Sequence, residues 1–126
     1  MEKTNRQEAK NFLKKAMGLL DDDNPEIMRC YAICEYRSGN KEGGMSYLQQ
    51  AFEMNKFDAE IILNMVELHI LQHQRKHAHR YIKYYHENNK KLQYFDKTQE
   101  QYDEKIHLFQ EYIVYQLDIK EVKEKK

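Results

Sequence analysis

The sequence predicts an all-α protein built from antiparallel helix pairs, with a long helix at its C-terminal end. The 126 residues include one proline and four glycines, so few residues would interrupt long helices. The chain matches itself when it is shifted by 34 residues, a length typical of a two-helix repeat. The last third carries apolar residues at helical spacing. Together these observations predict one helical domain over residues 1–126.

The internal repeat can be followed residue by residue. Six residues of the first copy recur as identical residues in the second: Glu26, Ile27, Tyr47, Glu53, Asn55 and Lys56 recur as Glu60, Ile61, Tyr81, Glu87, Asn89 and Lys90. Segments 25–55 and 59–89 are therefore predicted to be two helix pairs. Pro25 suits the first turn of a helix, and Asn24 or Asp23 is the expected cap.

Residues 39–55 hold the most specific pattern in the chain. Gly39 can adopt a positive φ angle, and Gly44, Leu48 and Ala51 follow on one helical face. With these residues the segment resembles the second helix of the tetratricopeptide repeat. The resemblance implies a turn at Gly39, a close approach of two helices at Gly44 and a superhelix of antiparallel helix pairs.

The other copies of this pattern depart from the family. In the second copy His73 takes the turn-glycine position and Tyr85 replaces the small Ala51. Residues 5–20 match only the second helix of a pair, so they are predicted to be half a repeat. The resemblance extends over about residues 5–90.

The C-terminal segment 96–119 is predicted to be one long amphipathic helix. Tyr102, Ile106, Phe109 and Ile113 form one apolar line, and Tyr112, Tyr115, Leu117 and Ile119 form a second. Helical repeats need a terminal helix that covers their last apolar face, which is one role for this segment. Two apolar lines also allow it to pair with another chain, including a second copy in a homodimer.

The family resemblance implies a partner-binding groove that is lined by the first helix of each pair. Carried onto this chain, its residues are Arg29, Ile33, Tyr36, Arg37, Leu63, Asn64, Glu67 and Leu71. This mixture implies an apolar groove with a charged rim, suited to a peptide or an amphipathic helix. The expected function is therefore that of a protein-binding adaptor.

Residues 9–87 are also similar to the repeats of type IV pilus biogenesis lipoproteins. The similar features are the segment 9–16, Cys34 and the stretch 61–85. This similarity implies an alternative role in pilus or secretion assembly, or as a secretion chaperone. The chain shows no apolar leader or span, so a cytoplasmic location is expected, and a periplasmic or membrane-anchored one if a leader precedes it.

Composition and motifs argue against several other functions. The formal net charge is zero, which does not favour nucleic-acid binding. The chain has neither a nucleophile elbow nor a glycine-rich phosphate loop, so neither an enzyme nor a cofactor is expected. His69 and His73 are four residues apart, as imidazole ligands of a metal can be, but the repeat pattern places a turn at His73. A packed or solvated histidine cluster is the favoured interpretation.

Overall fold

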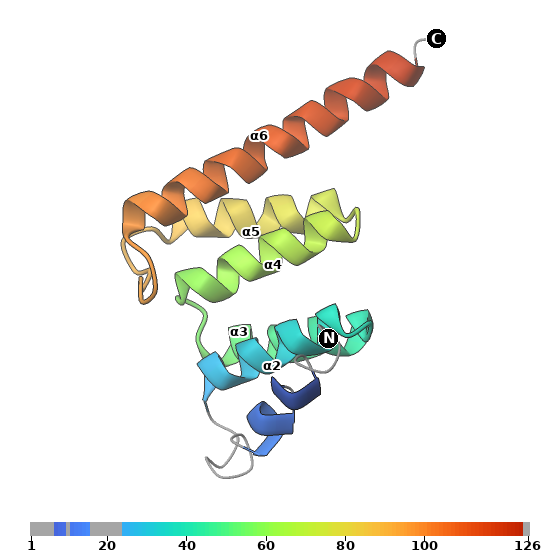
Figure 1. Ribbon diagram of the computed structural model, residues 1–126. Coiled ribbons are helices and arrows are strands. Elements are labelled where there is room, and N and C mark those ends of the chain that lie inside the picture. The colour runs from blue at the N-terminus through green and yellow to red at the C-terminus, as the bar shows by residue number, and fades with distance from the viewer. Residues whose placement is uncertain (1–6, 10, 16–23, 125–126) are drawn as a thin grey trace. The chain divides into compact units, whose positions relative to one another are not determined.

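The computed structural model describes residues 7–9, 11–15 and 24–124, with side chains described as far as residue 116. The main helices of this part of the chain are α2 (Pro25–Arg37), α3 (Lys41–Met54), α4 (Ala59–Leu71), α5 (Arg75–Glu87) and α6 (Gln99–Glu124) (Figure 1). The predicted all-α helical-repeat class is therefore confirmed. Of the predicted half-repeat 5–20, residues 7–9 and 11–15 are helical and the others lie outside the described residues.

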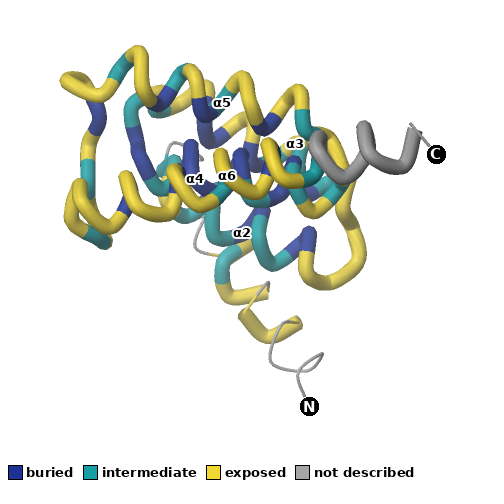
Figure 2. The backbone as a smooth tube through the Cα atoms, turned by 90° about the horizontal axis from the view of Figure 1, so that it is seen from above, coloured by how far each residue is buried: buried dark blue, intermediate teal, exposed yellow. Residues whose placement is uncertain are grey.

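The chain divides into two compact units, Met1–Lys56 and Phe57–Lys126. The first contains the helix pair α2 and α3, and the second contains the pair α4 and α5 together with α6. Each of the two predicted repeats therefore lies in a unit of its own. Figure 2 shows that buried and exposed residues alternate along α2, α3 and α5, as amphipathic helices require, whereas α4 is buried along most of its length.

Local sequence sets the limits of the first helix pair. The Asn24 side chain accepts a hydrogen bond from the Ile27 amide at 3.1 Å, and Pro25 occupies the first turn of α2. α2 ends at Arg37, and the turn that follows contains Gly39, whose φ angle of 106° is open to glycine and strained for other residues. Asn40 then caps α3 through the Gly43 amide at 3.1 Å. The expected turn glycine and the expected cap of α2 are both present.

Gly44 marks the closest approach of α3 to α2. A Cβ atom on Gly44 would lie 2.7 Å from Cβ of Tyr36 and 2.8 Å from the carbonyl oxygen of Ala32. Both distances are shorter than a van der Waals contact, so only a hydrogen atom fits between the helices here. Leu48 and Ala51 follow on the same buried face of α3. The small residue that the repeat pattern predicts is therefore required by packing.

We expect Gly44→Ala to destabilise the first helix pair. The new methyl group would meet backbone atoms of α2, and such overpacking costs about 1–3 kcal/mol, more than the helix propensity that alanine adds. The measurement is the free energy of urea unfolding, with Ser46→Ala as the control because Ser46 is exposed on the same helix. A Gly44→Ala protein as stable as the wild type would contradict the close approach.

The second helix pair turns at His73. Asp58 caps α4 through the Glu60 amide at 2.9 Å, and Gln72 follows the last residue of the helix. His73 has a φ angle of 60°, in the region that glycine adopts most easily. The sequence pattern placed a turn here, and the structure confirms it.

The segment between α5 and α6 returns to the start of α4. The Gln93 amide donates to the Phe57 carbonyl at 2.7 Å, and the Ala59 amide donates to the Gln93 carbonyl at 3.0 Å. Thr98 and Gln101 then form a reciprocal capping box, with bonds of 2.9 and 3.2 Å. This box begins α6 at Gln99, three residues later than the predicted 96, and the helix continues to Glu124.

Two hydrogen bonds between tyrosines and carboxylates hold the start of α6 on the second helix pair. The Tyr102 hydroxyl donates to Oε2 of Glu60 in α4, and the Tyr85 hydroxyl of α5 donates to Oδ1 of Asp103, each at 2.6 Å. Lys97 lies 3.3 Å from the same Glu60 oxygen. Tyr102 is fully buried, as is Ile106 one turn later. The N-terminal half of α6 therefore belongs to the core of the second unit.

These two hydrogen bonds lead to a prediction about alkaline pH. Burial, followed by the bonded carboxylate, raises the pKa of both Tyr85 and Tyr102 above the ordinary value of 10. The folded state then keeps protons that the unfolded state releases, so stability is complete below pH 10 and falls as the pH rises above it.

We expect Tyr102→Phe to lower the free energy of unfolding at pH 7 by about 1.5–3 kcal/mol, because a hydrogen bond to a charged group is lost. The variant should also lose less stability than the wild type between pH 9 and 11. Denaturant titrations across this range test both effects, with the exposed Tyr115→Phe as the control. Equal pH slopes in wild type and Tyr102→Phe would contradict the assignment.

Candidate functional site

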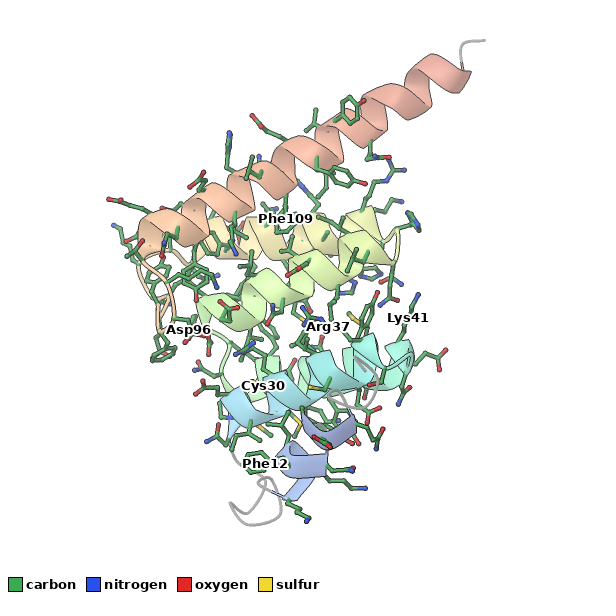
Figure 3. All side chains as sticks on the ribbon, in the orientation of Figure 1. Phe12, Cys30, Arg37, Lys41, Asp96 and Phe109 are labelled. Atoms are coloured by element: carbon green, nitrogen blue, oxygen red, sulfur yellow. The ribbon has the colours of Figure 1, made fainter. Side chains whose placement is uncertain are left out.

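The expected binding residues of α2 fall into two groups. Arg29, Ile33 and Arg37 are spaced four residues apart and form one line along the helix, which we call the α2 line. Arg29 and Ile33 are half-buried, and Arg37, labelled in Figure 3, is exposed at the end of α2. Tyr36 is buried against Gly44 of α3, so its side chain serves the packing of the helix pair. The α2 line is the part of this set that a partner could reach.

The expected binding residues of α4 differ in the same way. Leu63 and Asn64 are buried, Glu67 is half-buried, and Leu71 is 58% exposed at the end of the helix. α4 has buried residues on all sides because Ile61, Ile62, Met65 and Val66 are also enclosed. The accessible part of this set is its C-terminal end.

A third surface lies on α6. Leu108, Tyr112 and Tyr115 are 55%, 44% and 60% exposed, and their spacing of four and three residues places them on one face of the helix. We call these three residues the α6 stripe. It lies on a different face from Tyr102, Ile106 and Ile113, which are buried. Its two tyrosines belong to the second apolar line expected from the sequence, and that spacing, continued backwards, would also have found Leu108.

The length of α6 and its second apolar face together explain why these apolar residues are exposed. α6 contains 26 residues, whereas α4 and α5 contain 13 each. Figure 1 shows that its C-terminal part extends beyond the turn between α4 and α5. Figure 2 colours most of its described residues as exposed. The helix pair therefore covers only part of an element that carries apolar residues on more than one face.

The α6 stripe has charged residues on both sides. Glu104 and Glu111 are exposed and lie along one side of it, one helical turn from Leu108. We call this pair the acidic border. Glu111 is also 3.1 Å from Nε2 of His107, and both of these side chains are exposed. Lys105 is exposed on the opposite side of the stripe.

The histidines of the second unit form a stacked cluster. His69 is buried, and its ring stacks on His77 and on Tyr81 with ring centroids 5.1 and 5.6 Å apart. Nδ1 of His69 is 2.8 Å from Oε1 of Gln74. Because Gln74 bonds this ring, its side chain does not cap α5, which it precedes. The contacts of His69 are those of a packed core residue.

The metal-site hypothesis concerned His69 and His73. His73 is exposed in the turn after α4, and His69 is engaged with Gln74. Among the residues that the structure describes, no group of three or more His, Cys, Asp or Glu side chains is placed to hold a metal ion.

The helices described here include none that is long and apolar enough to cross a membrane.

Burial of His69 predicts a loss of stability in mild acid. Burial, together with the charge of His77, lowers the pKa of His69 below the ordinary value of 6.5, although the bond to Gln74 opposes the shift. Below pH 6.5 the unfolded state therefore binds a proton that the folded state does not bind, and the free energy of unfolding falls. We expect His69→Gln to lose less stability than the wild type between pH 7 and 5. Thermal unfolding measures this, with the exposed His79→Gln as the control; identical losses in the wild type and His69→Gln would contradict it.

Comparison with known proteins found no relative of this chain. It matches no protein-family model, no curated protein and no solved structure.

Proposed function

We propose that this protein is a non-enzymatic interaction module that binds another protein, and that the α6 stripe is its main contact surface. The observation that carries this proposal is the exposure of Leu108, Tyr112 and Tyr115 on one face of α6. Scattered apolar residues are common on protein surfaces, but apolar side chains that adjoin on one face of a helix are typical of interaction sites. We also interpret the two helix pairs as tetratricopeptide-like repeats, the second of which supports this helix.

The composition of the stripe supports the proposal. Tyrosine is enriched at the centres of protein interfaces because its ring is large, has few rotatable bonds and carries a polar hydroxyl group. Complete burial of each of these side chains would contribute about 1.5–3 kcal/mol before the costs of association. Three such side chains on a firmly held helix can supply a large part of the binding energy of a modest interface.

The firm attachment of α6 is part of this argument. Tyr102 and Tyr85 fix the start of the helix through Glu60 and Asp103. The backbone of the stripe is then presented as a helix before a partner arrives. Less conformational entropy is lost on binding when the contact surface is already formed.

We expect the triple variant Leu108→Ala, Tyr112→Ala, Tyr115→Ala to stop capturing its protein partner while its fold persists. All three side chains are exposed, and alanine favours the helix, so the change removes contact area without opening the core. The measurement is affinity capture from a lysate of the source organism with mass spectrometry, together with circular dichroism. A double variant, Glu100→Ala with His107→Ala, is the control on the same helix.

The α2 line is the alternative location of the partner-binding site. Arg29→Glu combined with Arg37→Glu tests it better than a change at Tyr36, because Tyr36 is buried and its removal would disturb the helix pair. Capture that survives loss of the α6 stripe but fails in this variant would transfer the binding site to α2. Capture that survives in both variants would overturn the proposed function at both surfaces.

A further inference from the structure

We infer that the segment bound at the α6 stripe is a basic amphipathic helix from another protein. This inference rests on the proposed function, because it names the partner of the same surface. It is carried by two observations together: the spacing of Leu108, Tyr112 and Tyr115, and the acidic border formed by Glu104 and Glu111.

The apolar part of the surface has the form that a helix recognises. From Leu108 to Tyr115 the stripe extends for about 10 Å, or two helical turns, at 1.5 Å per residue. A second helix with apolar side chains at spacings of three and four residues can pack along such a line. An extended peptide strand would need unpaired backbone groups at a sheet edge, and α6 pairs its backbone internally.

The charges beside the stripe favour a positively charged partner. Glu104 and Glu111 are seven residues apart, so both face the same flank of a docked helix. The pair between Glu111 and His107 is exposed on both sides, and pairs of this kind contribute little energy that a partner would have to overcome. A docked helix with Lys or Arg on the flank that meets this border would form complementary contacts with both carboxylates.

A second copy of α6 fits the surface less well. In an antiparallel pair of α6 helices the acidic border of each copy would face that of the other, and like charges repel. In a parallel pair in register the acidic border of each copy would face the opposite flank of the other copy, where Lys105 supplies one cation for two carboxylates. The antiparallel pair therefore brings like charges together and the parallel pair leaves one carboxylate of each border without a cation, whereas a basic helix from another protein can place a cation opposite each carboxylate.

An anionic membrane surface is also disfavoured as the occupant. Helices that lie on such membranes carry Lys and Arg beside their apolar face, because these residues contact the lipid phosphates. The α6 stripe has Glu104 and Glu111 in those positions along one side. The charges next to the stripe therefore favour a cationic protein segment over an anionic lipid surface.

Two synthetic peptides test the inference directly. Each is an 18-residue helix with the same leucine stripe, and the two differ only in having lysine or glutamate beside that stripe. Fluorescence anisotropy with the full chain measures their affinities. We expect the lysine peptide to bind about ten-fold more tightly or better, since two attractive charge pairs replace two repulsive ones, and the preference should weaken as salt screens these charges.

A charge reversal on the protein gives the matched test. Glu104→Lys with Glu111→Lys should invert the preference, so that the glutamate peptide binds more tightly. Glu42→Lys with Glu53→Lys is the control, because it changes the net charge by the same amount at exposed positions of α3. This control should keep the preference for the lysine peptide.

The outcomes separate this inference from the proposed function. Equal binding of both peptides, abolished by alanine in the α6 stripe, would overturn the selection by charge and leave the stripe as a binding surface. If neither peptide binds but the alanine variant still loses its cellular partner, the inference fails and the proposed function stands. Sedimentation showing a dimer that depends on the stripe would make a second copy the occupant and would also overturn the inference.

Discussion

The hydrogen bond between Tyr102 and Glu60 is the interaction on which the second unit depends most. It joins the first turn of α6 to the first turn of α4 at 2.6 Å, and Lys97 lies against the same carboxylate. A phenol and a carboxylate can share such a site only if the hydroxyl keeps its proton, which burial favours. This bond orients α6 so that Ile106 reaches the core, and it thereby decides which face of the helix remains outside.

Charge distribution along the second unit supports the same arrangement. α5 carries Arg75, Lys76, Arg80 and Lys83 against a single acidic residue, Glu87, whereas α6 is rich in glutamate and aspartate. Neighbouring helices of opposite charge attract each other, although exposed charges contribute modestly and are weakened by salt. The excess of acid on α6 thus assists its packing on α5, and it also sets the charge beside the α6 stripe.

Much of the fold could be predicted from the sequence because its determinants are local. The 34-residue period located both helix pairs, Gly39 and His73 located their turns, and Gly44 located the close contact of α2 with α3. Contacts between distant residues gave no such signal: Glu60 is 42 residues from Tyr102, and nothing in the repeat relates them. The binding residues were predicted less well than the fold. Tyr36 has the helical position of a groove residue, but it is buried because Gly44 has no side chain and α3 packs closely against it.

The unequal lengths of α6 and the helices beneath it make α6 a lever. Ile113 is the last buried residue among the described side chains of α6, and Glu124 lies about 16 Å beyond it along the axis at 1.5 Å per residue. A rotation of about 10° at Ile113 would move Glu124 by roughly 3 Å over that length. The position of the far end therefore depends on how firmly the core holds Ile113 as well as Tyr102.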